Sequence, residues 1–188
     1  MVVQTVLMAP EALNLKKENT PEEEGETFSQ DIEQVMKGVH LVESSEGQQE
    51  WELWADQATS FRDKNAWNLR NVKIVFFSEN EKTFHVVGAE GVVELGTKNM
   101  EIKGDVKLDS VNGYNFSTER MTYKSNGKLL ESHVPVKMLG PKDKSGRSMS
   151  LNGNGMKALV DTSIMNVIGD IKAEKYFKKS QEVKIQSG

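Results

Sequence analysis

The 188-residue chain contains no cysteine, which excludes thiolate catalysis, disulfide bonds and cysteine-ligated zinc sites. Its histidines, His40, His85 and His133, are far apart in the sequence. A jelly-roll metal enzyme needs closely spaced histidines and a carboxylate on neighbouring strands. We therefore expect neither a metal site nor a cofactor. Acidic residues outnumber basic ones and the net charge is −4, so we also expect no nucleic acid partner.

Long apolar runs and catalytic motifs are missing as well. The uncharged run at residues 1–10 is too short to span a bilayer and lacks the basic region of a signal peptide. No Gly-x-Ser-x-Gly elbow occurs. The stretch from Gly140 to Ser148 resembles a phosphate-binding loop, but its glycines are too far apart and Arg147 replaces the lysine. We expect a protein that is not an enzyme and is soluble as it stands, with any membrane anchor outside this chain.

What the chain does contain is a pair of strand-like phrases that alternate from about residue 38 onward. The first phrase begins with a large apolar residue and has an apolar residue two positions later and a small residue four positions later. Another small or apolar residue follows seven positions after the first. This phrase begins at Trp51, Phe84, Tyr114 and, more weakly, Met149. The second phrase is a turn-prone or small residue, an aliphatic, a polar and an apolar residue. It begins at Gly38, Asn71, Asp105, Pro135 and Asp170. This regular return indicates a stacked β-repeat architecture.

The body of the chain also has the period of two that is typical of strands with one dry and one wet face. Ile102, Gly104, Val106 and Leu108, for example, alternate with charged residues. The pairs Asn112-Gly113 and Asn126-Gly127 favour tight hairpins. We predict an all-β fold of roughly ten to fifteen antiparallel strands without a confident helix. Such strands form a sandwich, a closed barrel or a jelly roll.

Small residues recur at one position of the first phrase. They are Ala55, Gly88, Thr118 and Gly153. Next to the large residues of each copy, they leave room for crossing backbones or for a lumen that something else fills. Plain packing of large against small side chains in a dry core is the alternative, and the sequence leaves these possibilities open.

Composition divides the chain into three parts. Residues 1–34 form a flexible acidic arm, because the stretch from Glu18 to Glu33 holds acidic residues but no Lys or Arg. Residues 35–178 form the folded β-domain, and residues 179–188 a flexible tail. These boundaries are expectations from the sequence.

The repeated phrases resemble the periplasmic part of the lipopolysaccharide-transport protein C (LptC) family. The resemblance rests on Met36 to Glu43 with Trp51 to Ala58, on Gly104 to Leu108, on Thr118-Glu119 leading to Ser132 to Val136, and on Gly153 to Met156 with Gly169 to Ala173. It covers about residues 35–176. The individual motifs are short, and their order and spacing carry the resemblance.

This resemblance implies a twisted, open antiparallel β-jelly roll in the Gram-negative periplasm. Such a domain receives lipopolysaccharide from an inner-membrane ABC transporter and passes it to a bridge protein of similar jelly rolls. Members usually carry an N-terminal membrane helix, which is not present in this chain. We expect the protein to be tethered to the inner membrane by such a helix. A soluble LptA-like bridge protein of the same pathway is the alternative.

The resemblance also implies an apolar groove for the acyl chains of lipid A, each methylene contributing about 0.8 kcal/mol when buried. We expect one face of every strand to line it: Val39, Leu41, Trp51, Leu53, Ala55, Val72, Ile74, Phe84, Val86, Val106, Leu108, Tyr114, Phe116, Val136, Met138 and Ile171. A structural or adhesive β-repeat protein without a lipid ligand is the competing class. An open apolar groove favours the carrier, and a filled core favours the structural protein.

Unpaired edge strands of an open roll can accept a partner's strand. We expect the N-terminal edge, about residues 38–43, to face the transporter, and the C-terminal edge, about residues 167–176, to face the bridge protein. The candidate edge residues are Gly38, Val39, His40 and Leu41 at one end and Gly169, Asp170, Ile171, Lys172 and Ala173 at the other. The same edges permit a homodimer.

Overall fold

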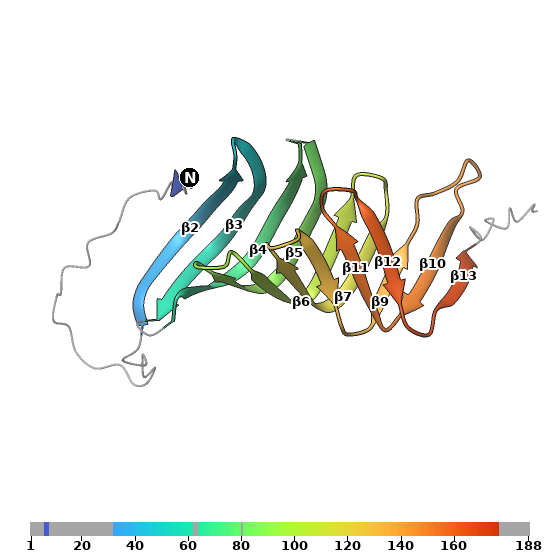
Figure 1. Ribbon diagram of the computed structural model, residues 1–188. Coiled ribbons are helices and arrows are strands. Elements are labelled where there is room, and N and C mark those ends of the chain that lie inside the picture. The colour runs from blue at the N-terminus through green and yellow to red at the C-terminus, as the bar shows by residue number, and fades with distance from the viewer. Residues whose placement is uncertain (1–5, 8–31, 62–63, 80, 177–188) are drawn as a thin grey trace, which may run out of the picture.

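The computed structural model describes residues 6–7, 32–61, 64–79 and 81–176. Within them the fold is all-β, and strands β2 to β7 follow one another in chain order along the molecule (Figure 1). The strands are β1 (Val6–Leu7), β2 (Ile32–Ser45), β3 (Gln48–Phe61), β4 (Ala66–Ser78), β5 (Glu81–Glu94), β6 (Met100–Ser110), β7 (Asn115–Lys124), β8 (Leu129–Ser132), β9 (Val136–Leu139), β10 (Ser148–Gly153), β11 (Gly155–Leu159), β12 (Ile164–Ile168) and β13 (Lys172–Tyr176).

All strand pairs are antiparallel and form one open, 13-stranded sheet. From β1 to β7 each strand pairs with the next. Strand β7 then pairs with β9 through residues 115–118 and with β8 through residues 122–124. Beyond β7 the sheet therefore has two branches, β9–β10–β13 and β8–β11–β12. This is the open β-jelly roll that the sequence predicted.

The long strands share one irregular row, where the pairing register shifts or skips. We call this row the fold line. It passes through Gly38, Asp56, Asn71, Ala89, Asp105 and Glu119. Gly38, Asn71 and Asp105 have φ angles of 64°, 52° and 47° there, in the left-handed region that glycine, Asn and Asp tolerate best. The fold line continues through the breaks between β8 and β9, β10 and β11, and β12 and β13.

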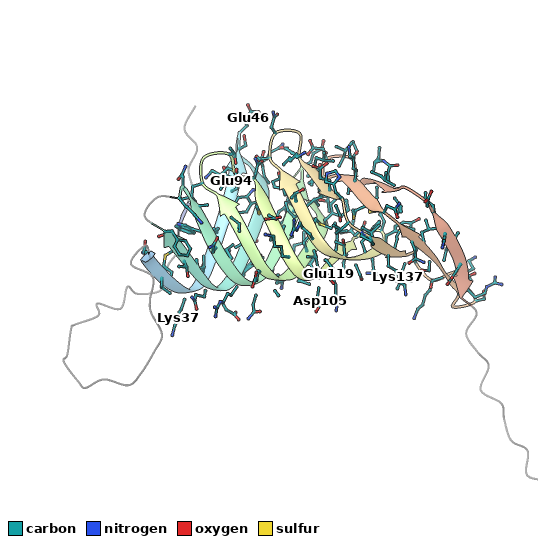
Figure 2. The ribbon with its side chains drawn as sticks, turned by 90° about the horizontal axis from the view of Figure 1, so that it is seen from below. Lys37, Glu46, Glu94, Asp105, Glu119 and Lys137 are labelled. Atoms are coloured by element: carbon teal, nitrogen blue, oxygen red, sulfur yellow. The ribbon has the colours of Figure 1, made fainter. Side chains whose placement is uncertain are left out.

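The fold line divides the sheet into two layers. Layer 1 comprises residues 39–55, 72–79, 81–88, 106–118, 136–153 and 172–176, and layer 2 comprises residues 32–37, 57–61, 64–70, 90–103, 120–132 and 155–168. Figure 2 shows Lys37, Asp105, Glu119 and Lys137 along one long edge of the molecule, where the layers are continuous, and Glu46 and Glu94 toward the opposite side. The hairpin tips of both layers lie on that opposite side, which we call the seam.

The hydrophobic core lies between the two layers and draws on both. In layer 1 it contains Leu53 and Ile74, and in layer 2 Ile102 and Met156, all with exposed fractions of 0%. The Phe76 ring of layer 1 packs on the Tyr123 ring of layer 2, with centroids 4.7 Å apart. One face of each layer thus closes on the other, as the period of two predicted.

Each of the two repeated sequence phrases corresponds to one direction in which a strand crosses the fold line. Strands that run from layer 2 to layer 1 carry the second phrase, whose turn-prone first residue lies at the line. Strands that run back carry the first phrase, whose small residue lies there because the layers are close. A Cβ atom on Gly88 would lie 2.4 Å from Ile102 Cγ2, and one on Gly153 would lie 2.3 Å from Val167 Cγ1. The small residues therefore serve close packing at these positions rather than a lumen.

Three sequence expectations concern the ends of the chain. The flexible arm falls largely on residues 8–31, and the flexible tail on residues 179–188, which lie outside the described residues. Strand β2 begins at Ile32, slightly before the expected boundary, and β1 pairs onto it from within the expected arm. Of the residues that the structure describes, none belongs to a helix long and apolar enough to cross a membrane.

Candidate functional site

The residues expected to line the groove come together between the two layers. All of them are buried in layer 1 except Tyr114, which is partly buried against the core, and Ile171. Ile171 lies in the connection between β12 and β13 and is 53% exposed, so it does not belong to the buried interior. Layer 2 contributes apolar residues that sequence reasoning left out of this set, among them Ala58, Leu69, Ile102 and Met121.

Through most of its length this interior is closed. Leu53, Ile74, Val86, Val106 and Leu108 have exposed fractions of 0%. These residues expose essentially no surface to solvent. The two layers pack on each other there as a filled core.

The interior is less covered at its C-terminal end. Met149 on β10 is 46% exposed, and Ile171 follows beyond the fold line. Leu151, Met165 and Val167 are only partly buried against the core. We call Met149, Leu151, Met165, Val167 and Ile171 the C-terminal mouth. In the last copy of the second phrase the aliphatic residue, Ile171, is exposed instead of buried. Among the described residues, β12 and β13 are the last strands and have no further strand on one side.

Polar side chains cross the seam between the hairpin tips of the two layers. Lys98 Nζ of layer 2 lies 3.3 Å from Glu43 Oε2 of layer 1, and Lys128 Nζ of layer 2 lies 3.7 Å from Glu50 Oε1 of layer 1. Lys128 Nζ is also 3.2 Å from Asp161 Oδ1 within layer 2. Sequence reasoning missed these pairs. The signal was Glu43, an acid at the inward position that follows Val39 and Leu41.

Burial and nearby negative charges in this region affect the pKa of Tyr123, whose ring lies beneath the seam. Burial raises the pKa of the Tyr123 hydroxyl far above its ordinary value of 10.0, and the negative charges of Glu50 and Asp161 act in the same direction. Two neighbouring polar atoms are buried without a hydrogen-bond partner among the described residues, Glu43 Oε2 and Trp51 Nε1. Glu43 and Trp51 face each other across β2 and β3.

The N-terminal edge differs from the expected free edge. Val6 and Leu7 of β1 pair with Val42 and Leu41, so the chain itself covers part of residues 38–43. On the outer face of the same strands, the His40 ring stacks on Trp54 with centroids 5.0 Å apart. His40 Nε2 lies 2.7 Å from Glu52 Oε1. His40 is therefore held in an outer-face cluster rather than at an open edge.

At the C-terminal end, the expected edge residues divide between a turn and a strand. Gly169, Asp170 and Ile171 form the connection that crosses the fold line, with a φ angle of 97° at Gly169. Lys172 and Ala173 belong to β13, which pairs with β10 on one side only. Strand β12 likewise pairs with β11 alone. Among the described residues, β12 and β13, one in each layer, thus each have one unpaired backbone edge at this end.

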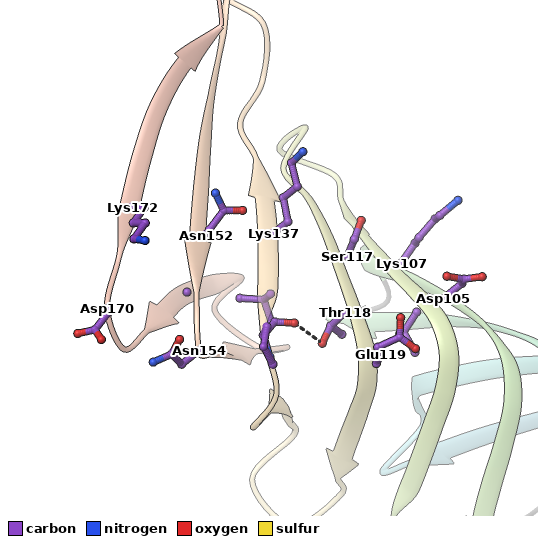
Figure 3. A pocket seen from close by; sticks show the side chains of 14 residues that line it. Asp105, Lys107, Ser117, Thr118, Glu119, Lys137, Asn152, Asn154, Asp170 and Lys172 are labelled. Carbon is purple, nitrogen blue, oxygen red and sulfur yellow. Dashed lines mark hydrogen bonds between the residues drawn. The ribbon is translucent and has the colours of Figure 1, made fainter.

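A separate polar groove of about 580 Å³ runs along the outer surface of layer 1 beside the fold line. Along it lie Lys107 on β6, Ser117 on β7, Lys137 on β9, Asn152 on β10 and Lys172 on β13 (Figure 3). Thr118 Oγ1 donates a hydrogen bond of 3.1 Å to the Pro135 carbonyl within it. Most of the residues that line it are polar, but Val106, Pro135 and Val136 also line it, and Val106 and Val136 belong to the core. The described residues contain no group of three or more His, Cys, Asp or Glu side chains placed to hold a metal ion.

Comparison with known proteins agrees with this architecture. The family model described as "Lipopolysaccharide-assembly, LptC-related" matches residues 1–176. No curated protein matches the chain. The family match spans the whole β-domain described above, from β1 to the end of β13. The chain therefore belongs to the LptC-related lipopolysaccharide-assembly family, whose members take part in lipopolysaccharide transport in the periplasm.

Proposed function

We propose that this domain is a non-enzymatic carrier that holds the acyl chains of lipopolysaccharide between its two layers. It receives them from an inner-membrane ABC transporter and passes them to a periplasmic bridge protein. The observation that carries the proposal is the single apolar interior, which continues from Val39 and Leu41 on β2 to the partly open C-terminal mouth. An unbranched interior of this kind suits acyl chains, because their burial is favourable without directed bonds.

The strand edges support a direction of transfer. Strands β12 and β13 have unpaired backbone groups beside the mouth, so a bridge protein that adds strands there would extend both layers and the interior between them. At the other end β1 occupies part of the β2 edge, and the transporter would bind the rest of β2 or displace β1. Deleting residues 167–188 should abolish bridge-protein binding in a pull-down. Survival of binding would contradict this assignment.

Photo-crosslinking at neighbouring positions of opposite orientation tests the carrier function. Phe116 is buried between the layers with an exposed fraction of 1%, whereas the next residue, Ser117, is exposed on the outer face. A photoreactive phenylalanine at Phe116 or Phe84 should capture lipopolysaccharide in cells, and the same group at Ser117 should not. Equal capture at Phe116 and Ser117, or no capture at any inner position, would contradict the proposal.

One observation favours a second function. The interior is filled, as in a structural β-repeat protein that binds no lipid. Crosslinking separates the two functions: a structural protein gives no lipid adduct at Phe84 or Phe116, while its stability depends on both residues.

A further inference from the structure

The two layers are joined in different ways along their two long sides. At the fold line strands β2 to β7 pass from one layer to the other, and the connections from β8 to β9, β10 to β11 and β12 to β13 cross it as well, so the backbone itself joins the layers there. At the seam the strands turn back, and the backbone hydrogen bonds that tie neighbouring hairpins remain within one layer among the described residues. Leu95 N–H, for example, donates to the Asn65 carbonyl within layer 2, and Val111 N–H donates to the Thr83 carbonyl within layer 1. Layers that separate must therefore do so at the seam.

Polar side-chain contacts cross the seam between the described residues of the two layers. They are the pairs Lys98–Glu43 and Lys128–Glu50 and the 3.1 Å hydrogen bond from Ser78 Oγ to the Asp161 carbonyl. The side chains of Lys98 and Lys128 are 24% and 31% exposed, so both amines reach solvent beside the apolar interior. The side chains of the carboxylate partners, Glu43 and Glu50, are only 7% and 16% exposed, so both ion pairs are partly buried, and separating them requires each carboxylate to reach water or another cation.

The seam also contains polar groups whose bonding is incomplete. Glu43 is only 5% exposed, yet its Oε2 atom accepts no hydrogen bond, although Lys98 Nζ is 3.3 Å away. Trp51 is 2% exposed and its indole N–H has no acceptor. A buried donor without an acceptor costs stability. Both groups gain partners if the seam opens and admits water or an anionic oxygen.

We propose that the seam is a lateral entrance closed by an ionic latch, and that Lys98 and Lys128 exchange their carboxylate partners for phosphate groups of the ligand when acyl chains enter. This inference rests on the proposed carrier function. The acyl chains then replace the contacts that the two layers lose, and the phosphates stay at the solvent boundary. The freed carboxylates of Glu43 and Glu50 become hydrated as the tips separate. The Trp51 indole gains an acceptor on the ligand or from water.

Opening can be measured without any ligand, because the chain has no cysteine of its own. A single Ala58→Cys substitution places a thiol in the interior, at a position with an exposed fraction of 0%. We expect the double variant Lys98→Gln/Lys128→Gln to raise the rate of thiol labelling at position 58 about three- to tenfold. The matched double variant Lys107→Gln/Lys157→Gln, which changes exposed lysines on the outer faces, should leave the rate unchanged.

The labelling experiment also distinguishes opening from unfolding. Faster labelling of the latch variant should appear at denaturant concentrations well below the unfolding transition. If the latch variant labels no faster than the outer-face control, or labels only in step with global unfolding, the latch is refuted.

A reversible staple tests the entrance itself. Cysteines at Glu43 and Lys98, joined by a flexible bis-thiosulfonate reagent, tie the layers together, whereas cysteines at Lys64 and Glu94 join tips of layer 2 only. The probe is purified lipid A carrying both phosphates, compared with the same lipid A after dephosphorylation. We expect the Glu43–Lys98 staple to block loading until a reductant releases it, and the Lys64–Glu94 staple to have no effect. Loading that is equal with both staples overturns the entrance.

Lipid A binding by the lysine variant tests the contact between the two lysines and the phosphates separately. Lys98→Gln/Lys128→Gln should weaken binding of bisphosphorylated lipid A at least fivefold and change binding of the dephosphorylated form by less than twofold. An equal effect on both forms overturns the exchange of carboxylate for phosphate. If neither lipid binds the parent protein, the carrier function fails, while the labelling rates still decide whether the seam is a latch.

Discussion

Asn71 Nδ2 donates a hydrogen bond of 2.7 Å to Asp56 Oδ2 at the point where β3 and β4 cross the fold line. Neither residue has a regular ladder partner in the other strand, and Asn71 has a φ angle of 52°. The side-chain bond thus replaces the missing backbone pairing at the bend. It ties two neighbouring strands together where the sheet turns from one layer into the other.

The bend at Asn71 predicts different effects for two substitutions. Asn71→Gly keeps the left-handed conformation and loses only an exposed hydrogen bond, so we expect a loss of about 0.5 kcal/mol in the free energy of unfolding. Asn71→Ala loses the bond and adds backbone strain of about 1–2 kcal/mol. Chemical denaturation of both variants measures the difference. Equal losses would show that the left-handed conformation contributes nothing to the bend.

Close approach of the layers makes Gly88 sensitive to size. A Cβ atom there would lie 2.4 Å from Ile102 Cγ2 and 3.2 Å from the Lys103 carbonyl oxygen. We expect Gly88→Ala to destabilise the fold by about 1–3 kcal/mol. Gly96→Ala is the matched control, because its nearest neighbour is the Asn65 amide at 3.2 Å. A loss at Gly88 no larger than at Gly96 would mean that the crossing accommodates a side chain.

Glu131 predicts an acid-sensitive part of the stability. A hydrogen bond from Lys124 lowers the pKa of its carboxyl below the ordinary value of 4.5, and a hydrogen bond from His133, 3.4 Å away, acts in the same direction. The folded state therefore binds the proton less well than the unfolded state. The contribution of Glu131 is present above about pH 4.5 and disappears as pH falls through the lower folded value.

Urea unfolding at a series of pH values checks this sign. The parent protein should lose stability more steeply than Glu131→Gln between pH 5 and pH 3. The variant Glu119→Gln, at an exposed position on β7, should follow the parent protein. Parallel curves for the parent protein and Glu131→Gln would contradict the assignment.

The C-terminal mouth predicts a loss of transfer without a loss of fold. Met149 and Ile171 are 46% and 53% exposed, so Met149→Asp/Ile171→Asp should change stability by less than about 1 kcal/mol. Charge at the mouth should nevertheless slow lipopolysaccharide transfer to the bridge protein by more than tenfold. Val111→Asp, which changes a 64% exposed residue in the turn after β6, should transfer normally. Normal transfer by the double variant would remove the mouth from the route.

Much of the fold could be predicted from the sequence, because the repeated phrases have a direct structural cause. The turn-prone residues Gly38, Asn71 and Asp105 adopt positive φ angles at the fold line. The alternation of apolar and polar residues on either side of these three positions correctly separated inward-facing from outward-facing residues in all but the last copies of the repeated phrases. Ile171 is exposed because the connection between β12 and β13, in which it lies, is at the end of the sheet, and parity alone does not reveal where a sheet ends.

The seam could not be predicted, because its contacts join residues that no local pattern relates. Lys98 lies in the hairpin turn after β5, whereas Glu43 is on β2. Only the inward position of Glu43, which follows the inward apolar residues Val39 and Leu41, gave a signal. The sequence also could not reveal that the interior is closed, since a filled core and a lipid groove require the same alternation of residues.

The most direct test of the carrier account is a nuclear Overhauser measurement between the acyl methylenes of lipid A and labelled methyl groups of the protein. Ile74, Val86 and Leu108 have exposed fractions of 0%, whereas Val111 and Ile164 are 64% and 52% exposed. The account predicts intermolecular contacts to the three buried residues and none to the two exposed ones. Contacts confined to Val111 and Ile164, with unchanged signals from the buried methyls, would contradict it.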